Sequence, residues 1–542
     1  MLFNSYTFLF AFLPIALGGA FALSRYRPNL VVAWLALASL FFYGWWSWRH
    51  VPLLLASIAF NFFAGDAIAR RGGKHGGQAS GLLAGAVAVN LAVLGYFKYA
   101  GFLVANLDTL LGAHMRIEAI VLPLGISFFT FTQVAYLVDV YRDPARYGAV
   151  PYALFVSYFP HLIAGPILHH REMMPQFAAP SSFRFEWANL AAGLTIFAIG
   201  LFKKTVLADG IAPYASPVYA QAAQGYAPGM AEAWGAAFSF GLQLYFDFSG
   251  YSDMAVGLSK MLGVRMPVNF ESPYKATSII DFWRRWHMTL SRFLRDYVYI
   301  ALGGNRRGTA RRYANLVVTM LLGGLWHGAA WTFVLWGALH GAFLALNHVW
   351  TALRARLPAG PKWLGSAGTA AGAVLTFLGV FGVWTIFRAD DLPSAIRIGR
   401  GLIGMNGLAL PPSALAEAAE TARAIGQARF VPWPVAQWIV SHFGALDAGL
   451  PIGIGRGRSA GVLISKAQIV WTAALFAIAW LAPNTRQIMV RAEAFLADHP
   501  VPPPPAFLAW RIDVRWAVAG ALLIAASLTS MSRVSEFLYF QF

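Results

Sequence analysis

Residues 29–48 read Asn29-Leu-Val-Val-Ala-Trp-Leu-Ala-Leu-Ala-Ser-Leu-Phe-Phe-Tyr-Gly-Trp-Trp-Ser-Trp48, a run without a charged side chain. A helix of about 20 apolar residues is long enough to cross the hydrocarbon core of a bilayer, which is roughly 30 Å thick. Comparable runs recur along the 542 residues, which are 58% hydrophobic and only 12% charged. Soluble domains average about 25% charged residues. The sequence therefore predicts an all-α, polytopic membrane protein.

The apolar runs follow one another closely, which predicts a single integral-membrane domain over residues 1–542. We expect about 11 or 12 membrane-embedded helices, some of them re-entrant. The first run, near Leu2 to Leu23, lacks the basic segment and cleavage site of a signal peptide and is interpreted as a retained helix. Residues 408–450 are less hydrophobic and are predicted to form an extramembrane or interfacial insertion. The chain has no cysteine, which excludes disulfides, thiolate metal sites and a cysteine nucleophile.

Basic residues outnumber acidic ones, which gives a net charge of +18. Their distribution among the loops predicts the membrane topology. Lys and Arg in short loops stay on the cytoplasmic side, and their distribution favours an amino terminus outside the cytoplasm. Residues 265–312 hold ten basic and three acidic side chains and are predicted to form a cytoplasmic or interfacial segment. Control of the membrane topology and attraction to anionic lipid headgroups explain most of this positive charge. The segment could also attract an acidic acyl donor. Because the charges are dispersed among apolar runs, a nucleic-acid surface is not expected.

Two histidines stand out in apolar surroundings, in Asp281-Phe-Trp-Arg-Arg-Trp-His287 and in Leu325-Trp-His327-Gly328. Ionisable groups inside a membrane usually face a bundle interior or a water-filled cavity, which makes both candidates for chemistry. The alternative for His327 is a core histidine bonded to a carbonyl at a helix break beside glycines. Residues 278–300 mix aromatic and basic side chains and predict an amphipathic helix that lies in the interface or against the bundle. An interfacial helix would accommodate His287 without a catalytic role.

A resemblance to the membrane-bound O-acyltransferases, in particular to the alginate O-acetyltransferase branch, spans the chain. The matching segments are Leu122-Pro-Leu-Gly-Ile-Ser-Phe-Phe-Thr-Phe131, Tyr158-Phe-Pro-His-Leu-Ile-Ala-Gly-Pro166, Tyr245-Phe-Asp-Phe-Ser-Gly-Tyr-Ser-Asp-Met254, Asn269-Phe-Glu-Ser-Pro-Tyr274, Asp281-Phe-Trp-Arg-Arg-Trp-His287, Arg295-Asp-Tyr-Val-Tyr299, Leu302-Gly-Gly-Asn-Arg306, Gly323-Gly-Leu-Trp-His-Gly328 and Phe537-Leu-Tyr-Phe-Gln-Phe542. One departure is His161, where this branch is expected to carry glutamine.

The resemblance implies a helical bundle around a central funnel or tunnel, in which a cytosolic acyl donor meets a hydroxyl acceptor. It assigns the essential catalytic role to His327, with His287 as its supporting partner. It also implies a bacterial inner-membrane location, acetyl-coenzyme A or an acyl-carrier thioester as donor, and a polysaccharide acceptor outside the cytoplasm. A periplasmic serine-type acetyltransferase is the expected partner, so transfer is either direct or relayed.

The chemistry suits histidine independently of the resemblance. Acyl transfer from a thioester to an alcohol needs a base for the hydroxyl proton, and a neutral imidazole can take it. No His-Glu-x-x-His motif or cysteine cluster is present to bind a metal, and none is expected.

Further candidates for the funnel or for substrate binding are Asp247, Asp253, Trp326, Arg284, Arg285 and Asn305. The six-residue spacing of the two aspartates argues against a paired acid and base and favours capping or pairing with arginine. Arg284 and Arg285 would either bind donor phosphates or reach lipid headgroups.

The sequence thus predicts a membrane O-acyltransferase that supplies acetyl groups to an extracytoplasmic, alginate-like polysaccharide. The alternatives are another acceptor, such as peptidoglycan, teichoic acid receiving D-alanine, a lipid or a protein. A transporter would be expected to show repeated halves with broken helices, and the sequence gives no sign of them.

Overall fold

The computed structural model describes residues 1–75, 77–113, 117–179, 181–356, 362–407, 465–497, 499–531 and Leu538. The insertion predicted at residues 408–450 lies outside the described residues.

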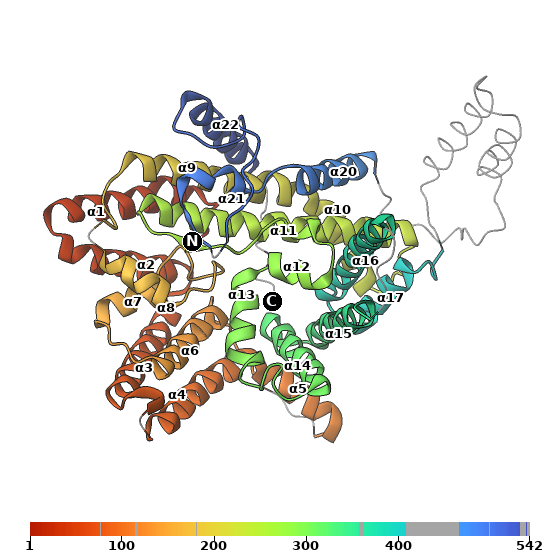
Figure 1. Cartoon of the computed structure of the whole chain (residues 1–542), viewed down its shortest axis with the longest axis horizontal. Helices are drawn as coiled ribbons and strands as arrows, with labels where there is room; N and C mark the ends of the chain where they lie inside the picture. Colours follow the sequence, from red (N-terminus) through yellow and green to blue (C-terminus); the bar gives the residue numbers. More distant parts are fainter. Residues whose placement is uncertain are drawn as a thin grey trace, which may run out of the picture.

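The described part of the chain is built almost entirely from helices, as predicted, and Figure 1 shows their arrangement. The α-helices up to residue 223 are α1 (Leu13–Tyr26), α2 (Val31–Ser47), α3 (Val51–Arg70), α4 (Ala79–Leu94), α5 (Ala100–Leu111), α6 (Ile126–Arg142), α7 (Ala149–Ser157), α8 (His170–Ala178), α9 (Trp187–Phe202) and α10 (Asp209–Ala223). Those that follow are α11 (Met230–Met261), α12 (Ile279–Arg285), α13 (Met288–Phe293), α14 (Thr309–His327), α15 (Trp331–Arg354), α16 (Lys362–Arg388), α17 (Leu392–Leu402), α20 (Lys466–Leu481), α21 (Thr485–Ile488) and α22 (Val514–Ser530).

Shorter elements connect or continue these helices. The π-helical turns are η1 (Phe8–Phe12), η5 (Gly95–Tyr99), η6 (Lys203–Ala208) and η8 (Leu294–Tyr299). The 3-10 turns are η2 (Pro28–Leu30), η3 (Trp48–His50), η4 (Gly73–His75), η7 (Pro273–Lys275) and η10 (Val490–Ala492). Two short strands, β1 (Met266–Pro267) and β2 (Phe495–Leu496), pair in parallel with Met266 opposite Phe495.

Six helical stretches within the described residues are long and apolar enough to cross a membrane. They are Phe8–Tyr26, Pro28–Arg70, Ala79–Leu111, Trp187–Ala223, Trp331–Arg354 and Gly365–Arg388. Two further apolar helices, α20 and α22, are shorter. The chain is therefore a multi-pass membrane protein, while the expected total of about 11 or 12 embedded helices stays a prediction.

Helix α11 forms the centre of the bundle and is buried along almost its whole length. It runs across the middle of Figure 1, packed against α9 and α10, with α12, α13 and α14 towards the centre of the view. Helices α14 and α15 approach each other through Gly324 and Gly337, where an added Cβ atom would collide with Phe333 O and Met320 O respectively. This close approach fixes the end of α14, where His327 lies.

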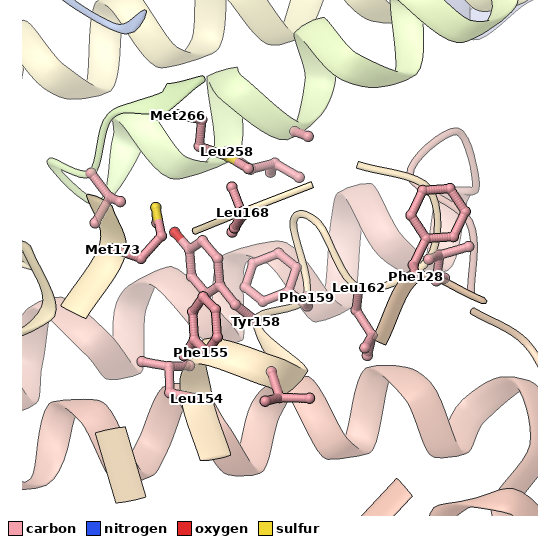
Figure 2. Packing of buried hydrophobic residues seen from close by; sticks show 14 of the residues in the cluster. Phe128, Leu154, Phe155, Tyr158, Phe159, Leu162, Leu168, Met173, Leu258 and Met266 are labelled. Atoms are coloured by element: carbon pink, nitrogen blue, oxygen red, sulfur yellow. The ribbon is translucent and has the colours of Figure 1, made fainter. Parts of the chain in front are cut away.

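The segment after α7 is irregular but fully buried. Figure 2 shows Phe155, Tyr158, Phe159 and Leu162 packed in the hydrophobic core, with Leu258 of α11 close by. Within this segment His161 is buried, and its Nε2 lies 2.9 Å from the carbonyl oxygen of Phe155. His161 is therefore a hydrogen-bonded core residue.

The prediction of a single amphipathic helix over residues 278–300 is wrong. The chain instead forms α12, α13 and the π-helical turn η8, with a break at Trp286 and His287. His287 has a φ of 43° and a ψ of 53°, the left-handed conformation that interrupts a right-handed helix. The next residue, Met288, donates its backbone N–H to Asn269 O instead of to a helical carbonyl. As a result His287 is 1% exposed and lies in the interior of the protein.

Candidate active site

His327 is the last residue of α14 and lines a cavity of about 140 Å³. Its imidazole is 7% exposed and is surrounded by aromatic rings. The ring centroid lies 4.9 Å from that of Trp326 and 5.2 Å from those of Trp336 and Phe387. Packing on these faces restricts the rotation of the imidazole, while the cavity leaves room for a small reacting group.

The cavity at His327 combines apolar walls with a few polar groups. Its lining residues are Trp46, Lys98, Leu122, Pro123, Leu124, Gly125, Ile126, Ser127, Phe128, Ile163, Trp326 and His327. Much of this wall comes from the segment Leu122 to Phe131 that the resemblance singles out. An apolar pocket with a few converging polar groups is the usual form of a small-molecule site.

The second predicted histidine lies close to the first. The ring centroid of His287 is 6.0 Å from that of Trp326, whose indole also contacts His327. The Nδ1 atom of His287 lies 3.0 Å from Oδ1 of Asn269. An Nδ1–H that donates to this oxygen leaves Nε2 as the acceptor nitrogen, and among the described residues Nε2 has no hydrogen-bond partner.

A second, larger cavity of about 320 Å³ lies beside the basic segment 265–312. Its polar and charged lining residues are Ser291, Arg295, Tyr299, Asn305, Arg312, Thr319 and His348. Of the six further candidates, Asn305 lines this cavity and Trp326 lines the cavity at His327. The two guanidinium groups of this cavity are of the kind that suits phosphate oxygens. Arg295 is paired with Asp296 at 2.7 Å, and Arg312 contacts His348 at 2.8 Å.

An aromatic partition separates the two cavities. Trp283 lines the larger cavity, and its ring centroid lies 5.9 Å from that of Trp336, which in turn packs on His327. The indole N–H of Trp283 donates to Nδ1 of His340 at 3.3 Å. We define Trp283, Trp336 and His340 as the aromatic partition. One cavity thus lies on each side of this partition, and the expected continuous funnel stays a prediction.

Three of the four remaining candidates lie in ion pairs. Lys204 Nζ is 2.8 Å from Asp247 Oδ1, and Lys203 Nζ is 2.6 Å from Asp253 Oδ2, so the aspartates pair with lysines where arginines were expected. Arg285 pairs with Asp281 at 2.8 Å, and the side chain of Arg284 is exposed.

Two site residues were not singled out from the sequence, Lys98 and Asn269. Lys98 is the one charged residue between Gly81 and Leu107, and an isolated lysine in such a run is a signal for a functional site. Asn269 begins the segment Asn269 to Tyr274, but only the structure reveals its contact with His287.

The model of the membrane-bound O-acyltransferase family matches residues 113–379 of this chain. The chain belongs to that family and is an O-acyltransferase. It is 42% identical to the peptidoglycan O-acetyltransferase of Helicobacter pylori over 76% of this chain and 81% of the relative. It is 44% identical to a probable alginate O-acetylase of Azotobacter vinelandii over 73% of this chain and 77% of the relative. A teichoic acid D-alanyltransferase of Streptococcus thermophilus is 30% identical over 42% of this chain and 57% of the relative.

Proposed function

We propose that this enzyme transfers acetyl groups from acetyl-coenzyme A to a hydroxyl of an extracytoplasmic polysaccharide, with His327 as the catalytic base. The observation that carries the proposal is the position of His327, a buried imidazole in the wall of a cavity and one aromatic layer from a basic cavity. Relatives named as O-acetyltransferases of peptidoglycan and alginate support the acetyl group and the class of acceptor.

In this reaction the acceptor oxygen attacks the thioester carbonyl carbon while the imidazole of His327 takes the hydroxyl proton. The tetrahedral intermediate then expels the coenzyme A sulfur as the C–S bond breaks, and the imidazolium returns the proton to that sulfur. The products are an acetyl ester and free coenzyme A. Positioned general-base catalysis contributes about 10²- to 10⁴-fold in rate.

The cavity beside segment 265–312 is the proposed donor site, because Arg295 and Arg312 can bind the phosphates of coenzyme A. The donor is cytosolic, so this cavity opens to the cytoplasm. In the same proposal the amino terminus lies in the periplasm, and the membrane is the bacterial inner membrane. His287, held by Asn269, supports His327 on the donor side.

The experiment that tests this function compares cell-envelope polymers from cells carrying the wild type, His327→Ala and His161→Gln at equal membrane abundance. We expect His327→Ala to lose acetyl esters. His161→Gln should keep them, because a glutamine amide can also hydrogen-bond in the core at position 161. Unchanged acetylation in His327→Ala would overturn the assignment.

The same ester analysis identifies the acceptor. Acetyl esters on an exopolysaccharide or on peptidoglycan distinguish the two classes named for the relatives, and D-alanyl esters would indicate the teichoic acid reaction instead. Loss of polymer acetylation on deletion of a periplasmic serine acetyltransferase, with acetyl transfer by this enzyme retained, would establish a relay through that partner.

A further inference from the structure

A partly buried lysine holds the end of the helix that carries His327. Lys98 lies in the π-helical turn η5, between α4 and α5, and its Nζ donates to the backbone oxygens of Trp326 at 2.5 Å and His327 at 3.1 Å. A third hydrogen bond, of 3.3 Å, joins it to Oγ of Ser127. A π-helical turn widens a helix by one residue and often occurs at functional sites.

Tyr99 and Gly328 bind the two preceding carbonyl oxygens at this end of α14. The hydroxyl of Tyr99 donates to Leu325 O at 2.7 Å, and the N–H of Gly328 donates to Gly324 O at 3.4 Å. The last four carbonyls of a helix have no partner within it, and here all four accept from these three residues. The lysine charge also lies at the negative end of the α14 dipole, where a cation is stabilised.

The environment of Lys98 differs from that of Lys204, a buried lysine in this chain. Lys204 lies between two carboxylates, Asp247 and Asp209, which neutralise its charge. The three hydrogen bonds of Lys98 go to neutral oxygens, two of which belong to Trp326 and His327. An ammonium group held by neutral oxygens is expensive to bury for stability alone, so its place at the cavity indicates a functional reason.

We propose that Lys98 is a positioning residue for His327, which it holds at the cavity wall by fixing the carboxyl end of α14, with Tyr99 securing the preceding carbonyl. The ammonium group of Lys98 contacts three oxygens, which match its three donor hydrogens, and no proton transfer is assigned to it. This role rests on the proposed function, because it acts through the imidazole of His327.

The test uses inside-out membrane vesicles from expressing cells, which contain the endogenous acceptor, supplied with labelled acetyl-coenzyme A. Initial rates of label incorporation give a maximal rate per folded enzyme and an apparent KM for the donor. The variants are Lys98→Met, Lys98→Arg, Tyr99→Phe and His327→Ala. The matched control is Lys74→Met, which removes an exposed lysine in η4.

We expect Lys98→Met to lower the maximal rate about 10- to 100-fold, since small displacements of a catalytic group have effects of this size. The donor KM should stay within about 2-fold because the donor cavity is not touched. Lys98→Arg should recover part of the rate, since a guanidinium can still donate to both carbonyls. Tyr99→Phe, which loses one hydrogen bond, should lower the rate about 2- to 10-fold, and Lys74→Met should match the wild type.

The proposal is overturned if Lys98→Met keeps the wild-type maximal rate, or if its rate falls only in proportion to folded protein and Lys98→Arg restores nothing. If Lys98→Met does not reach the membrane, Lys98→Arg and Tyr99→Phe decide the matter through their rates per folded enzyme. An active His327→Ala would refute the proposed function itself. An inactive His327→Ala beside a fully active Lys98→Met would refute the positioning role alone.

Discussion

Asn269 fixes the ring of His287 through a contact of 3.0 Å between Oδ1 and Nδ1. The same amide oxygen accepts from the hydroxyl of Thr289 at 3.0 Å, and the backbone oxygen of Asn269 accepts from Met288 N. One asparagine therefore sets both the orientation of the imidazole and the left-handed break in the chain beside it.

Replacing Asn269 should impair catalysis more than folding. Asn269→Ala leaves Nδ1 of His287 without its acceptor and frees the ring, and we expect the acetylation rate to fall about 10- to 100-fold. Vesicle assays with labelled acetyl-coenzyme A measure the rate, and detergent-solubilised protein gives the melting temperature. Asn269→Asp keeps an acceptor oxygen and should retain more activity. Equal rates for Asn269→Ala and the wild type would contradict a supporting role for His287.

The basic cavity should govern donor affinity. Arg312 lines it and contacts His348, whereas the neighbouring Arg311 is exposed and serves as the matched control. Loss of one charged hydrogen bond, about 1.5 kcal/mol, corresponds to roughly a ten-fold change in affinity. Arg312→Gln should therefore raise the KM for acetyl-coenzyme A about ten-fold with little change in maximal rate, and Arg311→Gln should change neither. An unchanged KM in Arg312→Gln would place the donor elsewhere.

The buried lysine between η6, α10 and α11 should matter for stability. Lys204 lies 2.7 Å from Asp209 and 2.8 Å from Asp247; Lys204 and Asp247 are buried and Asp209 is partly buried. Lys204→Met leaves two carboxylates without their cation, which costs about 3–5 kcal/mol. The melting temperature should fall strongly, whereas the double variant Lys204→Met with Asp247→Asn should recover part of the loss. A melting temperature equal to that of the wild type would mean that the ion pairs contribute nothing.

The contact between α14 and α15 should tolerate no larger residue. A Cβ atom at Gly337 would collide with Met320 O, so Gly337→Val forces the two helices apart. Overpacking of this kind costs about 1–3 kcal/mol. Because α14 ends at His327, activity per folded enzyme should fall as well. Gly85→Ala in α4, where a Cβ meets nothing within 4 Å, is the control and should be neutral or stabilising. Normal activity in Gly337→Val would show that the helix spacing does not position His327.

Much of the fold was predictable because it depends on local sequence. Uncharged runs such as residues 29–48 are sufficient to predict membrane helices, and His327 stands out as a polar residue at the end of one helix. The break at His287 was missed because its conformation depends on Asn269, 18 residues earlier. Periodicity describes which face a residue occupies in a regular helix, and it carries no information about such a contact.

The polar contacts of the site were less predictable because they join distant parts of the chain. Lys98 reaches the carbonyls of Trp326 and His327, 228 and 229 residues away. The aspartates of α11 pair with Lys203 and Lys204 of η6, which the sequence analysis did not single out. Tertiary packing decides which charges meet, and the sequence of one chain does not encode those partners in any simple spacing.

The aromatic partition has a consequence for the energetics of the cell. An enzyme that connects a cytosolic donor with an outer acceptor faces the risk of becoming a leak for protons and ions down their electrochemical gradient. Indole rings packed between the two cavities would interrupt a column of water through the protein. In the proposed reaction, the membrane would thus stay electrically sealed while an uncharged acetyl group crosses it.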